Sequence, residues 1–247
     1  MMERKIWIHS TIAGLNLAAA SQFSEIVTQA IQSRGFANVS LSGGETPKGV
    51  YRLLAQYPYQ SSICWEKIHF YWGDERCVPP ENPESNYGQV LKALLNHVSV
   101  RTENIHRIYG DHTPEDAAAE YILELARNAQ ENQAWPIFDI AFLGMGEDGH
   151  TASLFPGKIV PEVDTTPVIA VSADYQGRPA ARVTLTPLVF NTSRNVLILV
   201  TGANKAPMLS KALKNPHDSA DFPIQLIQPI HGSVFWHVDS SAAKLIR

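Results

Sequence analysis

Cysteine is scarce in this chain: Cys64 and Cys77 are the only two among 247 residues. They form neither a CxxC pair nor a cluster with zinc-ligand spacing, and the nine histidines show no HExxH or other zinc motif. A secreted scaffold held by disulfides and a metal site are therefore disfavoured. Two free thiols in a reducing cytoplasm are expected instead.

Long apolar runs and an excess of basic charge are also missing. No run approaches the ~20 residues that span a bilayer, and polar residues at 9–11 interrupt the stretch that a secretion signal would need. Lysine and arginine number 20 against 24 acidic residues, and the formal charge is −4. The sequence therefore predicts a cytoplasmic protein that binds neither membranes nor nucleic acid, and any anionic ligand must be held by a local site.

Apolar segments typical of strands alternate with helical patterns along the chain, and 45% of its residues are hydrophobic. This alternation predicts a single α/β domain over residues 1–247, with a mostly parallel Rossmann-like sheet and helices on both faces. One helix over 19–31 should end at Gly35, and another should begin after Thr113, with Pro114 in its first turn. The expected strands are 5–9, 38–41, 68–72, 138–143, 167–172, 181–185, 195–201 and 233–238.

Two of the expected strands run into glycine-rich loops. Ser-Gly-Gly at 42–44 precedes a predicted helix in which Thr46 is the expected N-cap, and a second loop spans 144–150. Glycines before a helix let backbone N–H groups approach an anion, and both loops would lie at the carboxyl ends of the strands, where ligands bind. An isolated Gly-Gly pair is equally typical of a tight turn. Neither GxxxxGK[ST] nor a completed dinucleotide motif is present.

Charged side chains follow two of these strands. Asp74, Glu75 and Arg76 come directly after the strand at 68–72, where they form either a solvated turn or part of a site at the sheet's carboxyl edge. Asp148 and His150 stand on the second glycine-rich loop. A single histidine is often structural, but one beside an aspartate on such a loop is a candidate general base. No GxSxG is present, so a serine hydrolase with a nucleophile elbow is disfavoured.

Two further cations complete the set. Arg182 lies in an alternating strand, and Lys205 follows another strand-to-helix turn. Arg182 or Lys205 alone is typical of a surface charge. Together with the first glycine-rich loop, the two could build a phosphate clamp from backbone donors and cations. The residues by themselves therefore predict an α/β protein that binds a small phosphorylated molecule. The members of the clamp would be Ser42, Gly43, Gly44, Thr46, Arg182 and Lys205.

At these motifs the chain resembles the 6-phosphogluconolactonases, a branch of the glucosamine-6-phosphate deaminase and lactonase superfamily. The segments appear in the family's order and cover the chain from about residue 5 to the C-terminus. The combination is specific, whereas the Ser-Gly-Gly element alone is not. The segments that carry the resemblance are 41–47, 72–79, 85–87, 144–156, 182–184 and 202–206.

The deaminases are the nearest competitor, because they share the sugar-phosphate loop, the Asp-Gly-His sequence and the two cations. Their pattern has a tyrosine where this chain has Arg76 and a glutamate where it has Phe155. That glutamate belongs to the acid–base relay of ring opening, and a phenylalanine cannot transfer a proton. The resemblance therefore favours a lactonase over a deaminase.

The resemblance implies hydrolysis of 6-phospho-D-glucono-1,5-lactone to 6-phosphogluconate, without a metal or organic cofactor, by a monomer or homodimer. It makes His150 the general base that activates water and Asp148 the residue that orients it. Arg76 would position the lactone or stabilise the oxyanion, and Asp74 would hold Arg76 or the sugar hydroxyls. The phosphate would be bound by the clamp residues.

A protein of a different class stays open as an alternative. The same phosphate loop and cations would also suit a sugar-phosphate sensor without catalytic activity, because a fold does not fix a function. A poised base is of little use to a binding protein, and turnover distinguishes the two. A deaminase would instead release ammonia from glucosamine 6-phosphate.

Overall fold

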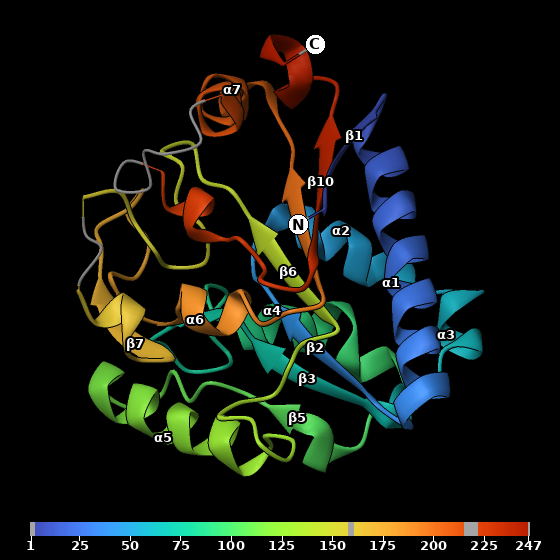
Figure 1. Cartoon of the computed structure of the whole chain (residues 1–247), viewed down its shortest axis with the longest axis vertical. Coiled ribbons are helices and arrows are strands. Elements are labelled where there is room, and N and C mark those ends of the chain that lie inside the picture. Colours follow the sequence, from blue (N-terminus) through green and yellow to red (C-terminus); the bar gives the residue numbers. More distant parts are fainter. Residues whose placement is uncertain (1–2, 158–160, 215–221, 247) are drawn as a thin grey trace.

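The computed structural model describes residues 3–157, 161–214 and 222–246. Its central feature is a seven-stranded sheet with helices on both sides (Figure 1), which confirms the predicted fold class. The strand order is β1-β10-β9-β6-β2-β3-β5, and every neighbouring pair is parallel. The strands are β1 (Glu3–His9), β2 (Ala37–Leu41), β3 (Ile68–Trp72), β5 (Ile105–His106), β6 (Ile140–Gly144), β9 (Asn195–Val200) and β10 (Ser233–Asp239).

The helix boundaries follow local signals in the sequence. Gly35 ends α1 with φ of +87° and donates its N–H to Ile31 O, and Thr113 caps α5 by accepting the N–H of Asp116. Both boundaries were predicted, although α1 begins earlier than expected. The helices are α1 (Ile12–Arg34), α2 (Glu45–Leu54), α3 (Tyr59–Ser62), α4 (Asn86–Ala93), α5 (Pro114–Arg127), α6 (Pro187–Phe190) and α7 (Ala206–Lys214).

The core forms where helices cover the middle of the sheet. Every residue of β2 is buried, as are the first four of β6, because strands of a parallel sheet are covered on both faces. Phe142 of β6 contacts Phe23 of α1 and Tyr51 of α2, with ring centroids 6.0 Å and 5.8 Å apart. The two helices therefore pack on the same face of the sheet.

A second, antiparallel sheet of three strands was not anticipated. Its order is β4-β8-β7, formed by β4 (Asp74–Arg76), β8 (Ala181–Leu185) and β7 (Val168–Ser172). The expected strands at 167–172 and 181–185 exist, but they belong here and not to the parallel sheet. The residues of β4 are buried, so their reading as a solvated turn is wrong. Three charged residues carry no apolar pattern, and only their pairing with β8 makes them a strand.

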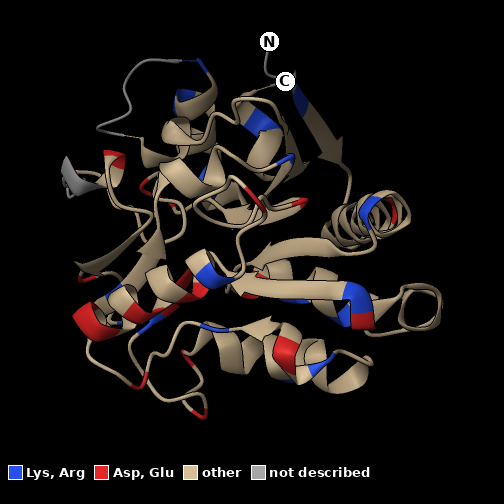
Figure 2. Cartoon of the chain, turned by 60° about the horizontal axis from the view of Figure 1, so that its bottom comes forward, with Lys and Arg blue, Asp and Glu red and all other residues tan. Residues whose placement is uncertain are grey.

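The loops after four adjacent strands converge at one edge of the parallel sheet. Strands β9, β6, β2 and β3 are neighbours, so the polypeptide leaving each one enters the same region. This is the edge at which ligands bind in open α/β sheets. Acidic and basic residues are interspersed along the helices and loops of the chain (Figure 2).

Two sequence expectations concern features outside this edge. Among the described residues, no helix is both long and apolar enough to cross a membrane. Cys64 is exposed, Cys77 is half-buried, and both are free thiols. Residues 215–221, to which the sequence assigns no role, lie outside the described part of the chain.

Candidate active site

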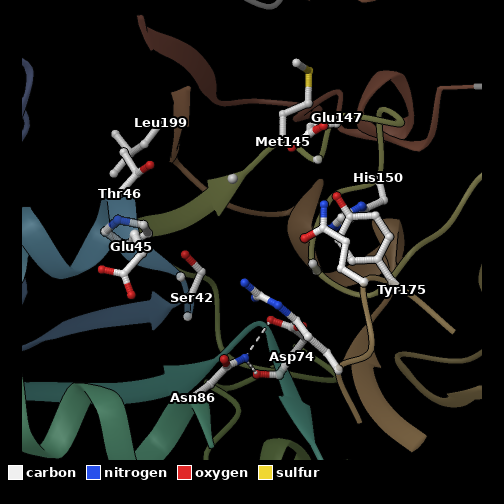
Figure 3. Close-up of a pocket in the computed structure, with 18 of the residues that line it drawn as sticks. Ser42, Glu45, Thr46, Asp74, Asn86, Met145, Glu147, His150, Tyr175 and Leu199 are labelled. Carbon is white, nitrogen blue, oxygen red and sulfur yellow. Dashed lines mark hydrogen bonds between the residues drawn. The ribbon is translucent and has the colours of Figure 1, made fainter. Parts of the chain in front are cut away.

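A cavity of about 390 Å³ opens at the carboxyl ends of β2, β3, β6 and β9 (Figure 3). Nine of the ten site residues predicted from the sequence line it, and the tenth, Asp148, is hydrogen-bonded to one of the nine. The structure thus brings together loops that are more than 150 residues apart in the chain. The nine lining residues are Ser42, Gly43, Gly44, Thr46, Asp74, Arg76, His150, Arg182 and Lys205.

The loop after β2 has the geometry of an anion site. Gly44 adopts φ of +102° directly before α2, a conformation that residues with side chains rarely adopt. The Tyr51 hydroxyl fixes the loop by donating to Ser42 O at 2.9 Å and accepting from Ser42 N at 3.1 Å. The first N–H groups of α2 have no acceptor within the helix and carry its partial positive charge. An anion in the cavity would satisfy them.

Thr46 does not cap α2, contrary to the sequence-based expectation. The helix begins earlier, at Glu45, because the positive φ of Gly44 ends the loop there, and no side chain in the described part of the protein caps it. Thr46 Oγ1 instead lies 2.8 Å from Oγ1 of Thr201, at the end of β9. Thr46 therefore ties the loop after β2 to the loop that carries Lys205.

Two buried arginines stand opposite each other on neighbouring strands of the small sheet. Arg76 of β4 pairs in register with Arg182 of β8, and their exposed fractions are 6% and 2%. Arg76 Nη1 donates to Glu84 O at 2.5 Å and lies 3.3 Å from the Glu84 carboxylate. Within the described chain, Nε of Arg76 and both Nε and Nη2 of Arg182 are buried without a partner. Buried cations with unused donors are suited to bind anionic or carbonyl oxygens.

Asp74 is held beside these arginines by two neutral side chains. Its Oδ1 accepts from Asn86 Nδ2 at 3.1 Å, and its Oδ2 accepts from Ser153 Oγ at 2.7 Å. Burial lowers the pKa of Arg182, and the negative charge of Asp74 opposes that shift only in part. The carboxylate therefore offsets part of the cost of burying a cation in this wall.

His150 and Asp148 form a hydrogen-bonded pair on the loop after β6. His150 Nδ1 lies 2.6 Å from Asp148 Oδ1, and the backbone N–H of His150 donates to the same oxygen at 3.1 Å. Burial raises the pKa of Asp148, but the hydrogen bond and charge of His150 outweigh burial, so the pKa lies below its ordinary value. An ionised carboxylate only accepts hydrogen bonds. The proton of a neutral His150 is therefore on Nδ1, and Nε2 keeps a lone pair.

The glycines of this loop make room for the pair. A Cβ on Gly146 would lie 2.1 Å from His150 Nδ1 and 2.4 Å from Asp148 Oδ1. The turn is closed by the N–H of Gly146 donating to His150 O at 2.8 Å, and Gly149 has φ of +89°. Gly144, Gly146 and Gly149 have the spacing Gly-x-Gly-x-x-Gly, and here this loop folds around a histidine and its carboxylate partner.

Lys205 approaches the cavity from the end of β9. Burial lowers its pKa, and the carboxylates of Glu147 and Asp148 oppose that effect in part. The loop is connected to the His150 loop by Asn204 Nδ2, which donates to Glu147 Oε1 at 2.6 Å. The described ranges contain no group of three or more His, Cys, Asp or Glu side chains that could hold a metal ion.

Sequence reasoning missed other residues of this site, among them Asn86, Tyr175 and Arg178. Asn86 carried no assigned role, although the segment 85–87 is one of those that show the resemblance. Tyr175 and Arg178 line the cavity from the turn between β7 and β8. No motif surrounds them, and only the tertiary structure brings them to the cavity.

Residues 11–236 match the family of glucosamine-6-phosphate isomerases/6-phosphogluconolactonase. The chain is 38% identical to 6-phosphogluconolactonase of Aggregatibacter actinomycetemcomitans over 210 residues. This alignment covers 85% of the chain and 88% of that protein. The chain superposes on the solved structure of a devB protein with a TM-score of 0.89 and 34% identity. The superposition covers 100% of both chains. For 6-phosphogluconolactonase from Trypanosoma brucei, coverage of both chains is also complete, with a TM-score of 0.86 and 26% identity. The chain is a member of the glucosamine-6-phosphate isomerase/6-phosphogluconolactonase family.

Proposed function

We propose that this chain is an enzyme that hydrolyses 6-phospho-D-glucono-1,5-lactone to 6-phospho-D-gluconate, the lactonase step of the oxidative pentose phosphate pathway. The family and the relatives named 6-phosphogluconolactonase support the activity. The observation that carries the mechanism is the His150–Asp148 pair, 2.6 Å apart, beside one cavity that also contains unpaired arginine donors and the glycine-rich loop.

The phosphate would anchor the substrate at the glycine-rich loop. The free N–H groups at the start of α2, the Thr46 hydroxyl and the cations Arg182 and Lys205 are the donors for it, together with the buried Ser42 hydroxyl, which has no partner in the described chain. Binding energy from this end, remote from the reacting carbonyl, orients the lactone for attack.

His150 would remove a proton from the attacking water through Nε2, because Nδ1 is occupied by Asp148. The resulting hydroxide adds to C1 of the lactone and forms a tetrahedral intermediate with a negatively charged oxygen. Its collapse breaks the bond between C1 and the ring oxygen, and that oxygen takes the proton back from the imidazolium. Water is thus divided between the carboxyl group and the new hydroxyl, and no covalent enzyme intermediate is formed.

Arg76 would stabilise the developing oxyanion. Its guanidinium is held by Glu84, and its buried Nε has no partner in the described chain. Fixed donors of this kind act on the charge that appears in the transition state and need no reorganisation. Asp74, held by Asn86 and Ser153, would keep the arginines in place or bind sugar hydroxyls.

Deaminase chemistry is not supported by the residue beside the base. Phe155 stands where the deaminase pattern has its glutamate, and its ring centroid lies 4.6 Å from that of His150. An aromatic hydrocarbon can neither donate nor accept the proton that ring opening of an amino sugar requires. At this position beside His150, the site therefore has no acid–base group like that of the deaminase pattern.

The decisive experiment follows the opening of freshly generated 6-phosphogluconolactone by NMR, with and without protein, because the lactone also hydrolyses unaided. A rate well above background is expected, and His150→Asn should lose roughly 10²–10⁴-fold of the excess. His231→Asn, at an exposed histidine outside the cavity, should keep the parental rate.

Two other outcomes would change the conclusion. Folded protein that binds 6-phosphogluconate without accelerating hydrolysis would indicate a sensor. Ammonia released from glucosamine 6-phosphate would indicate a deaminase.

A further inference from the structure

The turn between β7 and β8 borders the cavity beside His150 (Figure 3). It is closed by the N–H of Ala173 donating to Ala180 O at 2.9 Å and that of Arg178 donating to Tyr175 O at 3.1 Å. Its two central residues, Gln176 and Gly177, have φ of +54° and +66°, as tight two-residue hairpin turns require. The backbone therefore fixes the point from which the Tyr175 side chain leaves the turn.

The Tyr175 ring meets the imidazole edge to face. The ring centroids of Tyr175 and His150 lie 4.7 Å apart with the planes at 78°, and Phe155 contacts the same imidazole at 4.6 Å and 31°. Tyr175 and Phe155 also contact each other, at 5.7 Å. The imidazole thus packs against two aromatic rings that support one another.

These ring contacts fix the orientation of the His150 imidazole, which the hydrogen bond to Asp148 alone does not. A single hydrogen bond at Nδ1 fixes one atom of the imidazole but lets the ring swing about that point. Packing against two rings in different orientations removes this freedom, and Nε2 is then held in one direction. Burial raises the pKa of Tyr175, so its ring stays neutral near physiological pH and adds no charge beside the base.

We propose that Tyr175 is a positioning residue, whose ring holds the His150 imidazole with Nε2 directed at the water that attacks the lactone. The proposal rests on the proposed role of His150 as the general base. Tyr175 touches neither water nor carbonyl in this mechanism. It acts through His150, and its ring, not its hydroxyl, orients the imidazole.

The test compares Tyr175→Leu with Tyr175→Phe in the lactone assay. Tyr175→Leu removes the ring, and kcat should fall roughly 10- to 100-fold, because a small misplacement of a catalytic group is costly. KM should stay close to the parental value, since the phosphate-binding groups are untouched. Tyr175→Phe keeps the ring and should restore most of kcat. Tyr109→Leu, at an exposed tyrosine outside the cavity, is the matched control and should leave both constants unchanged.

A spectroscopic measurement keeps the test independent of turnover. In the substrate-free protein, the His150 ring signals should be sharp for the parent and for Tyr175→Phe, and broadened by exchange for Tyr175→Leu. Melting temperatures of the three proteins show that each is folded, as expected for a side chain that is only partly buried.

The outcomes separate this proposal from the proposed function. Loss of activity in His150→Asn with parental kcat in Tyr175→Leu would overturn the positioning role alone. Equal losses in Tyr175→Phe and Tyr175→Leu would show that the hydroxyl acts, which also overturns it. Full activity in His150→Asn would overturn the base assignment, and the positioning role with it.

Discussion

At Gly43, the absence of a side chain decides how the site is built. A Cβ at this position would lie 1.8 Å from Asn86 Oδ1 and 2.4 Å from its Cγ. The amide of Asn86 occupies the space that a side chain would need, and from there Nδ2 donates to Asp74 O at 2.9 Å and to Asp74 Oδ1 at 3.1 Å. Glycine is therefore required here for a close approach between two loops, and not for an unusual backbone conformation.

Replacing Gly43 by alanine should displace Asn86 and break its bonds to Asp74. Loss of these buried hydrogen bonds and movement of the glycine-rich loop should weaken binding of 6-phosphogluconate by about 1–3 kcal/mol, or roughly 5- to 150-fold in Kd. Isothermal titration calorimetry measures this directly. Gly14→Ala in α1 is the matched control, because its Cβ would meet only Thr11 Oγ1, at 3.4 Å. A parental Kd for Gly43→Ala would contradict the argument.

At the scale of elements, Glu75 connects β4 to the start of α4. Its Oε1 accepts the N–H groups of Arg76 and Asn86, each at 2.7 Å, and its Oε2 accepts the N–H of Tyr87 at 2.7 Å and the Ser85 hydroxyl at 3.1 Å. Of the three charged residues of β4, Asp74 and Arg76 line the cavity, whereas Glu75 does not and instead binds the start of α4. Its carboxylate sets where Asn86 and Arg76 stand.

Glu75→Gln should destabilise the protein, because one oxygen becomes an NH₂ group facing donors that then have no acceptor. Burial raises the pKa of Glu75 to about 7, against the effect of its three backbone hydrogen bonds, so the comparison belongs at pH 8, where the carboxyl is ionised. The free energy of unfolding, from chemical denaturation, should drop by about 1–3 kcal/mol. Glu131→Gln, at an exposed glutamate, should change it little. Equal stability of Glu75→Gln and the parent at pH 8 would refute the role of Glu75 in connecting β4 to α4.

The elements differ in how well the sequence predicted them. Gly35 and Thr113 are local signals, and they ended α1 and began α5 as predicted. Strand β4 gave no such signal, because its residues are charged and its partner strand lies more than 100 residues later in the chain. Thr46 gave a misleading signal for the start of α2, because the helix begins one residue earlier, directly after Gly44.

At the scale of the whole molecule, a histidine pair with one buried member links the N-terminal strand β1 to its neighbour β10 in the sheet. His237 of β10 is fully buried, with Nε2 2.7 Å from Gln22 Oε1 and Nδ1 3.2 Å from Nε2 of His9, on β1. The two imidazoles stack with their centroids 5.3 Å apart. Burial and the nearby charge of a protonated His9 lower the pKa of His237 to about 4.

This shift predicts how the stability of the fold depends on pH. Between pH 6.5 and 4 the unfolded chain binds a proton at His237 and the folded chain does not, so acidification lowers the free energy of unfolding by a few kcal/mol. Above pH 6.5 both states are neutral at this residue and the effect is constant. His237→Gln should reduce the slope over this window, as measured by denaturation at several pH values. His231→Gln, at an exposed position, should leave the slope as in the parent. An unchanged slope in His237→Gln would show that another group is responsible.

The sequence by itself determined the fold class, the strands of the parallel sheet apart from β5, and nine of the residues that line the cavity. These features depend on information that is local in the chain. Apolar runs make buried strands, glycines and capping residues mark the ends of helices, and in a parallel sheet all carboxyl ends of adjacent strands lie at one edge.

Tertiary structure alone decided which side chains meet there. It placed Arg182 opposite Arg76 through an antiparallel sheet that the sequence did not reveal, and it turned Glu75 away from the cavity. It also brought Tyr175 against His150 from a turn without any motif. Contacts of this kind arise from packing between segments far apart in the chain, so no pattern within either segment encodes them.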